Sequence, residues 1–313
     1  MTKIALGIDI GGTKIAAGLV TDTGQVLARG QTPTPARSGA RQILATAVQL
    51  AKSLTGEHAD ASGPPVCVGI GSAGVIDPVT HLVASATDHL SGWVRADLGT
   101  AFRNEFSLPT TVHNDVHAHA VGEAFAGAGQ GYKSVLMVAA GTGIGGAVII
   151  DGLLDVGSHG AAGHLGHIPS AEAAGLACPC GKTGHVEAIG SGTGLHQLYG
   201  RLGGDRDVQD SRAVVARAAS DPLARQAIAT SAGALGRALG GIVNLIDPAA
   251  VIVSGGMINA GELWWDALDQ GLRDSAMPIL QNVPLLRASL GDDAAIIGAA
   301  LQAFESLQRN THA

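Results

Sequence analysis

"IALGIDIGGTKIAAGLVTDTGQVLARG", residues 4–30, places two small-residue turns between apolar runs. The turns are Gly11-Gly12-Thr13 and Asp22–Gly24, and they predict three consecutive strands. A similar stretch, "SVLMVAAGTGIGGAVIIDGLLDVG", occupies residues 134–157, with its turn at Gly141-Thr142-Gly143. This internal duplication of a β-hairpin unit predicts two similar α/β domains.

The segments between and after these stretches alternate between strand and helix patterns. We expect helices from residue 40, over residues 221–246 and over residues 292–307, and strands within residues 64–77 and 249–257. The polar residues 201–212 are interpreted as a surface loop. The expected domains are residues 1–117, a smaller N-terminal domain, and residues 118–292, a larger one, with a helix at about 293–311 packing back on the first.

The composition limits the class of protein. A length of 313 residues favours two domains, and 46% hydrophobic with 14% charged residues argues against disorder. The net charge of −7 argues against a nucleic-acid or anionic-membrane partner. Neither a membrane-spanning apolar run nor a signal-peptide pattern is found, and three cysteines do not form a disulfide framework. We therefore expect a cytoplasmic protein.

Both glycine turns have the chemistry of a phosphate site. A turn without Cβ atoms lets backbone N–H groups approach phosphate oxygens, and Thr13 and Lys14 add further donors. No Gly-Lys-Ser/Thr follows, so this is not a P-loop. An ordinary hairpin turn is the alternative, which the second copy of the turn makes less attractive. A third turn, Ser254-Gly255-Gly256, follows an apolar strand and is suited to lie against an adenine or ribose.

Asn114-Asp115 stands where a strand pattern changes to a helix pattern. A carboxylate placed there is suited to accept the proton of an attacking hydroxyl group in phosphoryl transfer. The same pair is also suited to cap the helix, a role that contributes about 1 kcal/mol. Local sequence alone favours the cap. His117 and His119, which follow on the helix, are interpreted as ordinary helix histidines.

A group of metal-binding residue types lies in "CPCGKTGHVE", residues 178–187. Cys178, Cys180 and His185 have spacings suited to zinc, which thiolates and imidazoles bind in a tetrahedron. A fourth ligand has to come from elsewhere, and "GAAGHLGHIP" just upstream offers His164 and His167. Buried free thiols beside a loop histidine are the alternative reading. Cys67, inside an apolar strand, is interpreted as a core residue.

The motifs and their order resemble the ROK group of sugar kinases, within the two-domain actin/hexokinase-like (ribonuclease H-like) ATPase fold. The resemblance runs from about Ile4 to the C-terminal helix. It implies an ATP-dependent sugar kinase that uses Mg²⁺ and holds a structural zinc ion. It also implies that the protein is a homodimer. Repressors of the group carry a helix-turn-helix domain ahead of this fold; because the first strand is predicted at Ile4, we expect no such domain here.

The resemblance also implies roles for individual residues. Asp9 would help to place Mg²⁺, and Asp115 would be the catalytic base. His167 would join Cys178, Cys180 and His185 as a zinc ligand, with His185 replacing the family's usual third cysteine. ATP would contact Gly11, Gly12, Thr13, Lys14, Gly141, Thr142, Gly143, Gly255 and Gly256, and the sugar would contact Gly74, Asn114, Asp115, His164, His167 and Glu187.

Two positions depart from the family pattern. Members that phosphorylate glucose usually show Glu-x-Gly-His, whereas residues 164–167 here read His-Leu-Gly-His, a pattern associated with bacterial N-acetylmannosamine kinases. An imidazole replaces a two-oxygen acceptor with one donor and one acceptor, which suits an acetamido group. His89 replaces a common asparagine. The expected activity is 6-phosphorylation of N-acetylmannosamine; glucokinase and a non-catalytic sugar-responsive protein are the alternatives.

Overall fold

The computed structural model describes residues 2–58, 63–86 and 89–311. The chain divides into two compact units: residues 1–132, 147–162 and 289–313 form the first, and residues 133–146 and 163–288 form the second. The first boundary falls after Tyr132, later than the expected 117/118. The difference arises because the helix that starts at Asp115 is continuous and packs against the C-terminal helix of the first unit.

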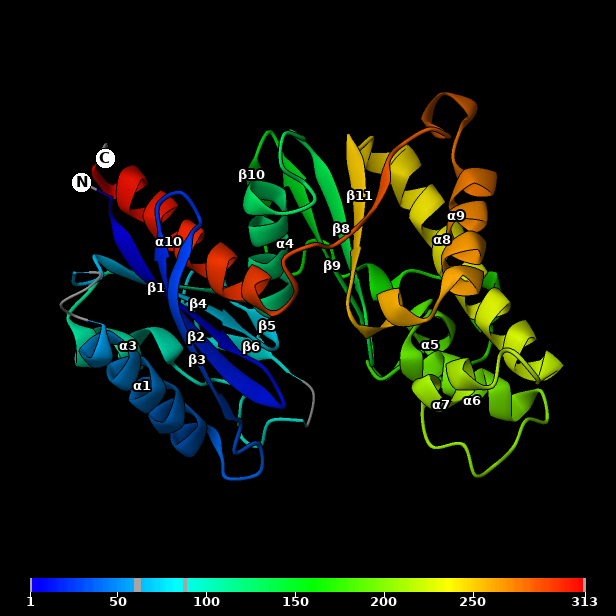
Figure 1. The fold of residues 1–313 in the computed structure, drawn as a ribbon, viewed down its shortest axis with the longest axis horizontal. Helices are drawn as coiled ribbons and strands as arrows, with labels where there is room; N and C mark the ends of the chain where they lie inside the picture. The colour runs from blue at the N-terminus through cyan, green and yellow to red at the C-terminus, as the bar shows by residue number, and fades with distance from the viewer. Residues whose placement is uncertain (1, 59–62, 87–88, 312–313) are drawn as a thin grey trace. The chain divides into compact units, whose positions relative to one another are not determined.

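The first unit is built on a five-stranded sheet in the order β3-β2-β1-β4-β7 (Figure 1). β1 runs antiparallel to β2, and β2 runs antiparallel to β3, as the quoted N-terminal stretch predicts, whereas β4 and β7 continue the sheet in parallel. The bounds are β1 Ile4–Ile10, β2 Lys14–Thr21, β3 Val26–Pro33, β4 Cys67–Ser72 and β7 Thr110–Asn114, with a small hairpin of β5 Val75–Ile76 and β6 Val83–Ser85.

Side chains of β1 alternate between two helical layers, as a buried strand requires. Leu6 and Ile8 join the core formed with α1 (Ala40–Glu57) and α3 (Leu98–Phe106), while Ala5 joins the core formed with α10 (Ala294–Thr311). Figure 1 shows α1 and α3 on one side of the sheet and α10 on the other.

Glycines let α10 lie directly on the sheet. A Cβ atom on Gly7 would stand 2.1 Å from the carbonyl oxygen of Ile296, and one on Gly69 would stand 1.8 Å from that of Ala299. Any larger residue at these positions would push the helix away. α4 (Asp115–Ala126) packs beside α10.

A second five-stranded sheet, in the order β10-β9-β8-β11-β12, has the same plan as the first. β10 is antiparallel to β9, and β11 is parallel to β8 and to β12. The duplicated hairpin expected from the sequence is therefore present. The bounds are β8 Val135–Ala140, β9 Ile144–Ile150, β10 Leu153–Asp155, β11 Ala250–Ser254 and β12 Leu285–Arg287.

Helices make up most of residues 163–288 of the second unit. The longest, α8, begins after the capping side chain of Asp221 and ends at Asp247, whose left-handed conformation and following Pro248 stop it. Among the residues described, none of the helices combines the length and hydrophobicity that crossing a bilayer requires. The bounds are α5 Glu187–Gly190, α6 Gly192–Arg201, α7 Ser211–Ala216, α8 Pro222–Ile246 and α9 Glu262–Ser275, with short 3₁₀ turns η1 Leu165–His167, η2 Ala171–Ala173, η3 Gly256–Asn259 and η4 Pro278–Leu280. A further turn, η5 Gly291–Asp293, belongs to the first unit.

Candidate active site

The acidic residues of the first unit lie at one edge of its sheet. Ile10 of β1 is in register with Ser72 of β4, which is in register with Asn114 of β7. These three strands are parallel, so Asp9 and Asp115 lie at the same, carboxyl, edge, where α/β sheets commonly bind ligands. Burial, followed by the charge of Asp115, raises the pKa of Asp9 to about 7. A carboxyl group with a raised pKa is one that a bound Mg²⁺ would favour in its ionised form.

Asn114 fixes the start of α4. Its Oδ1 accepts hydrogen bonds from the N–H groups of Val116 (2.9 Å) and His117 (3.2 Å), so Asn114 is the residue that caps the helix. Its Nδ2 donates to the carbonyl oxygen of Gly74 (2.8 Å) and to Oδ1 of Asp115 (2.9 Å). One side chain thereby holds the helix end, the expected sugar-contacting Gly74 and the candidate base together.

Asp115 has the environment of a proton acceptor. Burial raises the pKa of its carboxyl, an effect that hydrogen bonds from Val116 and Asn114 partly offset. A carboxylate with a raised pKa is a stronger base than an exposed one, so this position suits proton abstraction. Because Asn114 already caps α4, the helix does not depend on Asp115 for its cap.

Hydrogen bonds from within the protein fix the first glycine turn. Gly11 N–H donates to Lys14 O at 3.1 Å, and Thr34 Oγ1 donates to Gly11 O at 2.8 Å, while Gly12 and Thr13 are exposed. The Lys14 ammonium lies 2.6 Å from Asp292 Oδ2 in a surface pair. His89, also exposed, lies beside this turn, since its Cβ is 3.9 Å from where a Gly12 Cβ would stand.

The second glycine turn opens into a cavity of about 1050 Å³ within the second unit. The N–H of Gly192, at the start of α6, donates to Gly141 O at 2.7 Å, and Thr193 Oγ1 donates to Thr142 O at 2.8 Å. A Cβ atom on Gly141 would meet nothing within 4 Å, so this part of the turn is open. A helix N-terminus and a glycine turn together form a site suited to phosphate.

The rest of this cavity comes from residues that sequence reasoning missed. They lie at the start of α6, on α7 and the loop before it, and in and just after η3, three places far apart in the chain. Of the third predicted turn, Gly256 lines the cavity, whereas Gly255 (φ 89°) lies against the β8 backbone. The missed lining residues are Gly192, Thr193, His196, Gln209, Asp210, Ser211, Arg212, Val215, Ala216, Met257, Asn259 and Ala260.

The four candidate zinc ligands converge. The ligand atoms of His167, Cys178, Cys180 and His185 all lie within 4.8 Å of one another. Cys178 Sγ is 3.5 Å from His167 Nδ1, and Cys180 Sγ is 3.3 Å from His185 Nδ1. Zinc bonds of about 2.0–2.3 Å in a tetrahedron place ligand atoms roughly 3.3–3.8 Å apart. The donor set and these two distances therefore fit zinc, with His185 in the place of a cysteine.

Glu187 links this cluster to the second glycine turn. Its side chain is buried; Oε2 accepts from the N–H of Ile144 at 2.7 Å, and Cys178 Sγ donates to Oε1 at 3.8 Å. A Cβ atom on Gly143 would stand 2.7 Å from the same carboxylate. His164 directly precedes η1, with its ring 6.4 Å from that of His167. The expected sugar ligands of the second unit thus lie close to the four candidate zinc ligands.

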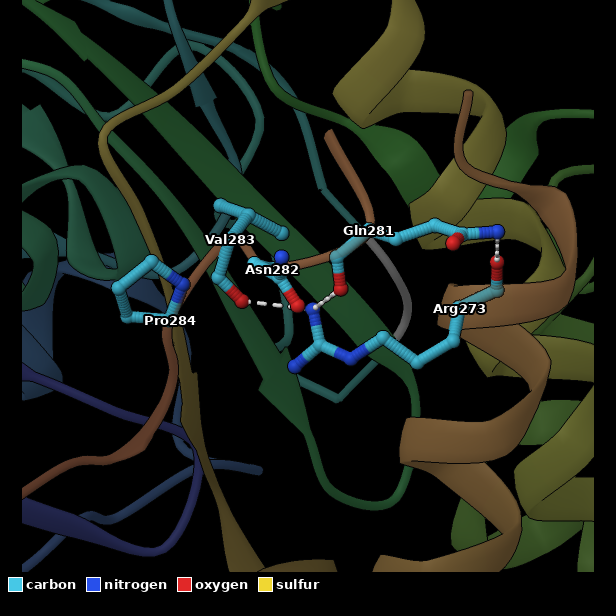
Figure 2. Close-up of a pocket in the computed structure, with 5 residues that line it drawn as sticks. All are labelled: Arg273, Gln281, Asn282, Val283 and Pro284. Carbon is cyan, nitrogen blue, oxygen red and sulfur yellow. Dashed lines mark hydrogen bonds between the residues drawn. The ribbon is translucent and has the colours of Figure 1, made fainter. Parts of the chain in front are cut away.

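Another cavity, of about 450 Å³, surrounds Arg273 (Figure 2). The guanidinium donates to the carbonyl oxygens of Gln281 (2.8 Å) and Val283 (2.7 Å), and it also pairs with Asp269. Gln281 Nε2 returns a hydrogen bond to Arg273 O at 3.4 Å. These contacts make Arg273 a structural brace for the segment that precedes β12, and none of the predicted site residues lies here.

Comparisons with known proteins agree on one family. The model of the ROK family matches residues 5–305. A glucokinase of Halalkalibacterium halodurans is 32% identical, with 94% of this chain and 92% of the relative covered. An N-acetylmannosamine kinase of Escherichia coli is 36% identical, with 95% and 97% covered. A ROK family glucokinase of Streptomyces griseus, solved with glucose and AMPPNP, superimposes with a TM-score of 0.80 at 31% identity, covering 96% and 99%.

Proposed function

We propose, since the chain belongs to the ROK family and is a sugar kinase, that it transfers the γ-phosphoryl group of ATP to the 6-hydroxyl of N-acetylmannosamine. The observation that carries the choice of sugar is His164, which stands where glucose-phosphorylating relatives usually have a glutamate. A neutral imidazole offers one donor and one acceptor, which suits a 2-acetamido group better than a pair of hydroxyls.

The chemistry assigned to the first unit is proton removal. The 6-hydroxyl oxygen attacks the γ-phosphorus, its proton passes to the Asp115 carboxylate, and the bond from the γ-phosphorus to the bridging oxygen breaks to release ADP. Asn114 keeps Asp115 in place through the 2.9 Å bond to Oδ1. Asp9 is the residue assigned to Mg²⁺, which neutralises phosphate charge when bound.

The second unit is assigned the binding of ATP and of part of the sugar. Backbone groups of the Gly141–Gly143 turn and the start of α6 face the ATP phosphates, and the 1050 Å³ cavity receives the rest of the nucleotide. His164 and Glu187 contact the sugar. A structural zinc ion on His167, Cys178, Cys180 and His185 would fix the loop that carries both.

We also expect a homodimer, which light scattering of the purified protein would test.

Glucokinase is the second candidate. It is supported by the 32% identity to the H. halodurans enzyme over nearly the whole chain and by Glu187, which retains the carboxylate expected to bind sugar. In this case the replacement of the glutamate by His164 would not change which sugar is preferred, because the sugar pocket would be less selective.

The variant His164→Glu separates the two candidates. We expect the ratio of kcat/KM for glucose to that for N-acetylmannosamine to rise about tenfold or more, a change of ~1.4 kcal/mol. His58→Glu, a partly exposed position at the end of α1, is the matched control and should leave the ratio unchanged. An unchanged sugar ranking in His164→Glu would show that this residue does not set specificity.

A further inference from the structure

Two buried polar side chains on α4 have no role in the proposed chemistry. Glu123 is completely buried, and His117 is 2% exposed. α4 is also the helix that begins with Asp115. Burying a carboxylate is costly unless hydrogen bonds compensate, so the partners of Glu123 indicate what it does.

Glu123 holds two distant segments of the chain. Its Oε1 accepts from the N–H groups of Ser289 (2.9 Å) and Leu290 (2.7 Å), and its Oε2 accepts from the N–H of Ala128 (3.0 Å). A Cβ atom on Gly127 would stand 2.1 Å from Oε2, so the chain approaches the carboxylate as closely as a glycine allows. Three backbone donors on one buried carboxylate form a strong and directional attachment.

These contacts lie beside the places where the chain passes between the units. It leaves the first unit after Tyr132, four residues beyond Ala128, and re-enters it for the last time at Ser289. His117 Nε2 lies 2.9 Å from the carbonyl oxygen of Ala162, which is the last residue before another passage. Of the four passages, at 132/133, 146/147, 162/163 and 288/289, α4 therefore contacts the chain near three.

The packing of α4 makes this arrangement stiff. A Cβ atom on Gly122 would stand 2.1 Å from Ala294 O, and one on Gly298 would stand 1.7 Å from Ala118 O, so α4 and α10 touch backbone to backbone. Close-packed elements transmit displacement instead of absorbing it. A displacement of the connecting segments consequently reaches α4, and with it Asp115.

We propose that Glu123 and His117 are positioning residues, which fix the base-bearing helix to the connecting segments so that Asp115 keeps its place during turnover. The proposal rests on the role of Asp115 in the proposed function. Motions that open and close an active site depend on a few hinge positions far from the chemistry, and changes at such positions commonly alter kcat.

Glu123→Gln tests the proposal with almost no change of shape. In the variant an amide NH₂ group, which is a donor, replaces one of the two carboxylate oxygens. It cannot accept from a backbone N–H group, so at least one charged hydrogen bond is lost. We expect amide hydrogen exchange at Ala128, Ser289 and Leu290 to accelerate about 10- to 100-fold, the range for losing such a bond. kcat should fall by roughly tenfold while KM for ATP and sugar changes less than about threefold. Glu105→Gln, which removes a surface pair with Lys52, is the matched control and should match wild type.

A second pair of variants covers the case in which Glu123→Gln does not fold. His117→Ala should lower kcat, and His117→Gln, which keeps a side-chain N–H donor toward Ala162, should restore much of it. Faster exchange with wild-type kcat in Glu123→Gln, or wild-type kcat in His117→Ala, would overturn the proposal. Absence of turnover by the wild type with every sugar would instead refute the proposed function, because the inference concerns only differences from an active wild type.

Discussion

At the scale of single residues, Asn114 caps α4, so the proposed role of base is left to Asp115. Asn114 donates and accepts in four hydrogen bonds that cap α4 and hold Gly74 and Asp115. The residue pair and its place at the junction could be predicted because a strand-to-helix change is a local pattern. Which member caps the helix could not, since that depends on the side-chain rotamer of each residue.

Asp115→Asn should lower kcat by about 10²- to 10⁴-fold, the usual range for the loss of a general base. Sugar binding should survive in part, because an amide still hydrogen-bonds a hydroxyl group, and Tm should change little since Asn114 caps α4. Steady-state kinetics and calorimetric sugar titration measure the two effects. Asp22→Asn, an exposed turn residue, is the control. Near-wild-type turnover would exclude Asp115 as the base.

Asp9 makes the metal-free protein sensitive to pH. Its pKa is about 7 in the folded protein, against an ordinary value of 3.8, so the folded state binds the proton more tightly than the unfolded state does. Stability from this group is therefore present at low pH and is lost as pH rises from about 4 to 7. Asp9→Asn should raise Tm relative to wild type at pH 8 and much less at pH 4.5, with Asp97→Asn, which preserves an exposed helix cap, as the control. An equal difference at both pH values would contradict this assignment.

At the scale of elements, the glycine turns could be predicted from sequence because each is a contiguous run of small residues between apolar strands. The cavity beside the second turn could not. Its other walls come from α6, the segment around Gln209–Arg212 and η3, and only tertiary packing brings these together. The polar stretch 201–212 was expected to be a surface loop, and no local signal shows that its last residues line a cavity.

Gly141→Ala tests whether ATP lies on the second turn. The added methyl group meets no protein atom within 4 Å, so Tm should hold while KM for ATP rises about tenfold or more, or ~1.4 kcal/mol of binding. Gly56→Ala, at an equally open position in α1, is the matched control and should leave KM unchanged while stabilising the helix by up to about 1 kcal/mol. An unaltered KM in Gly141→Ala would place ATP elsewhere.

If zinc binds as proposed, the position of the loop from Gly163 to Glu187 should depend on it. His185→Cys should retain one zinc ion per chain, because a thiolate is an equally competent ligand, whereas His185→Ala should lose zinc and raise KM for sugar more than KM for ATP. Elemental analysis alongside kinetics checks both, with His58→Ala as the control. Fully active wild-type protein with well under one zinc per chain would refute the structural metal.

At the scale of the whole molecule, the resemblance to ROK sugar kinases and the actin-like ATPase fold are confirmed by the family match over residues 5–305 and by the superposition on the S. griseus glucokinase. The duplicated turns contributed to that prediction, because the same glycine turn recurs between β1 and β2 and between β8 and β9. Substrate choice does not follow from the fold in the same way. Glucokinases and N-acetylmannosamine kinases share it at 32% and 36% identity to this chain.

The most direct test of the account is a competition among sugars. Wild-type protein is given ATP, Mg²⁺ and equal concentrations of N-acetylmannosamine, glucose and N-acetylglucosamine, and the phosphorylated products are counted at low conversion, where their ratio equals the ratio of kcat/KM. We expect N-acetylmannosamine 6-phosphate to dominate by tenfold or more, or ~1.4 kcal/mol in the transition state. A mixture dominated by glucose 6-phosphate would contradict the assignment of His164 and leave glucokinase as the function.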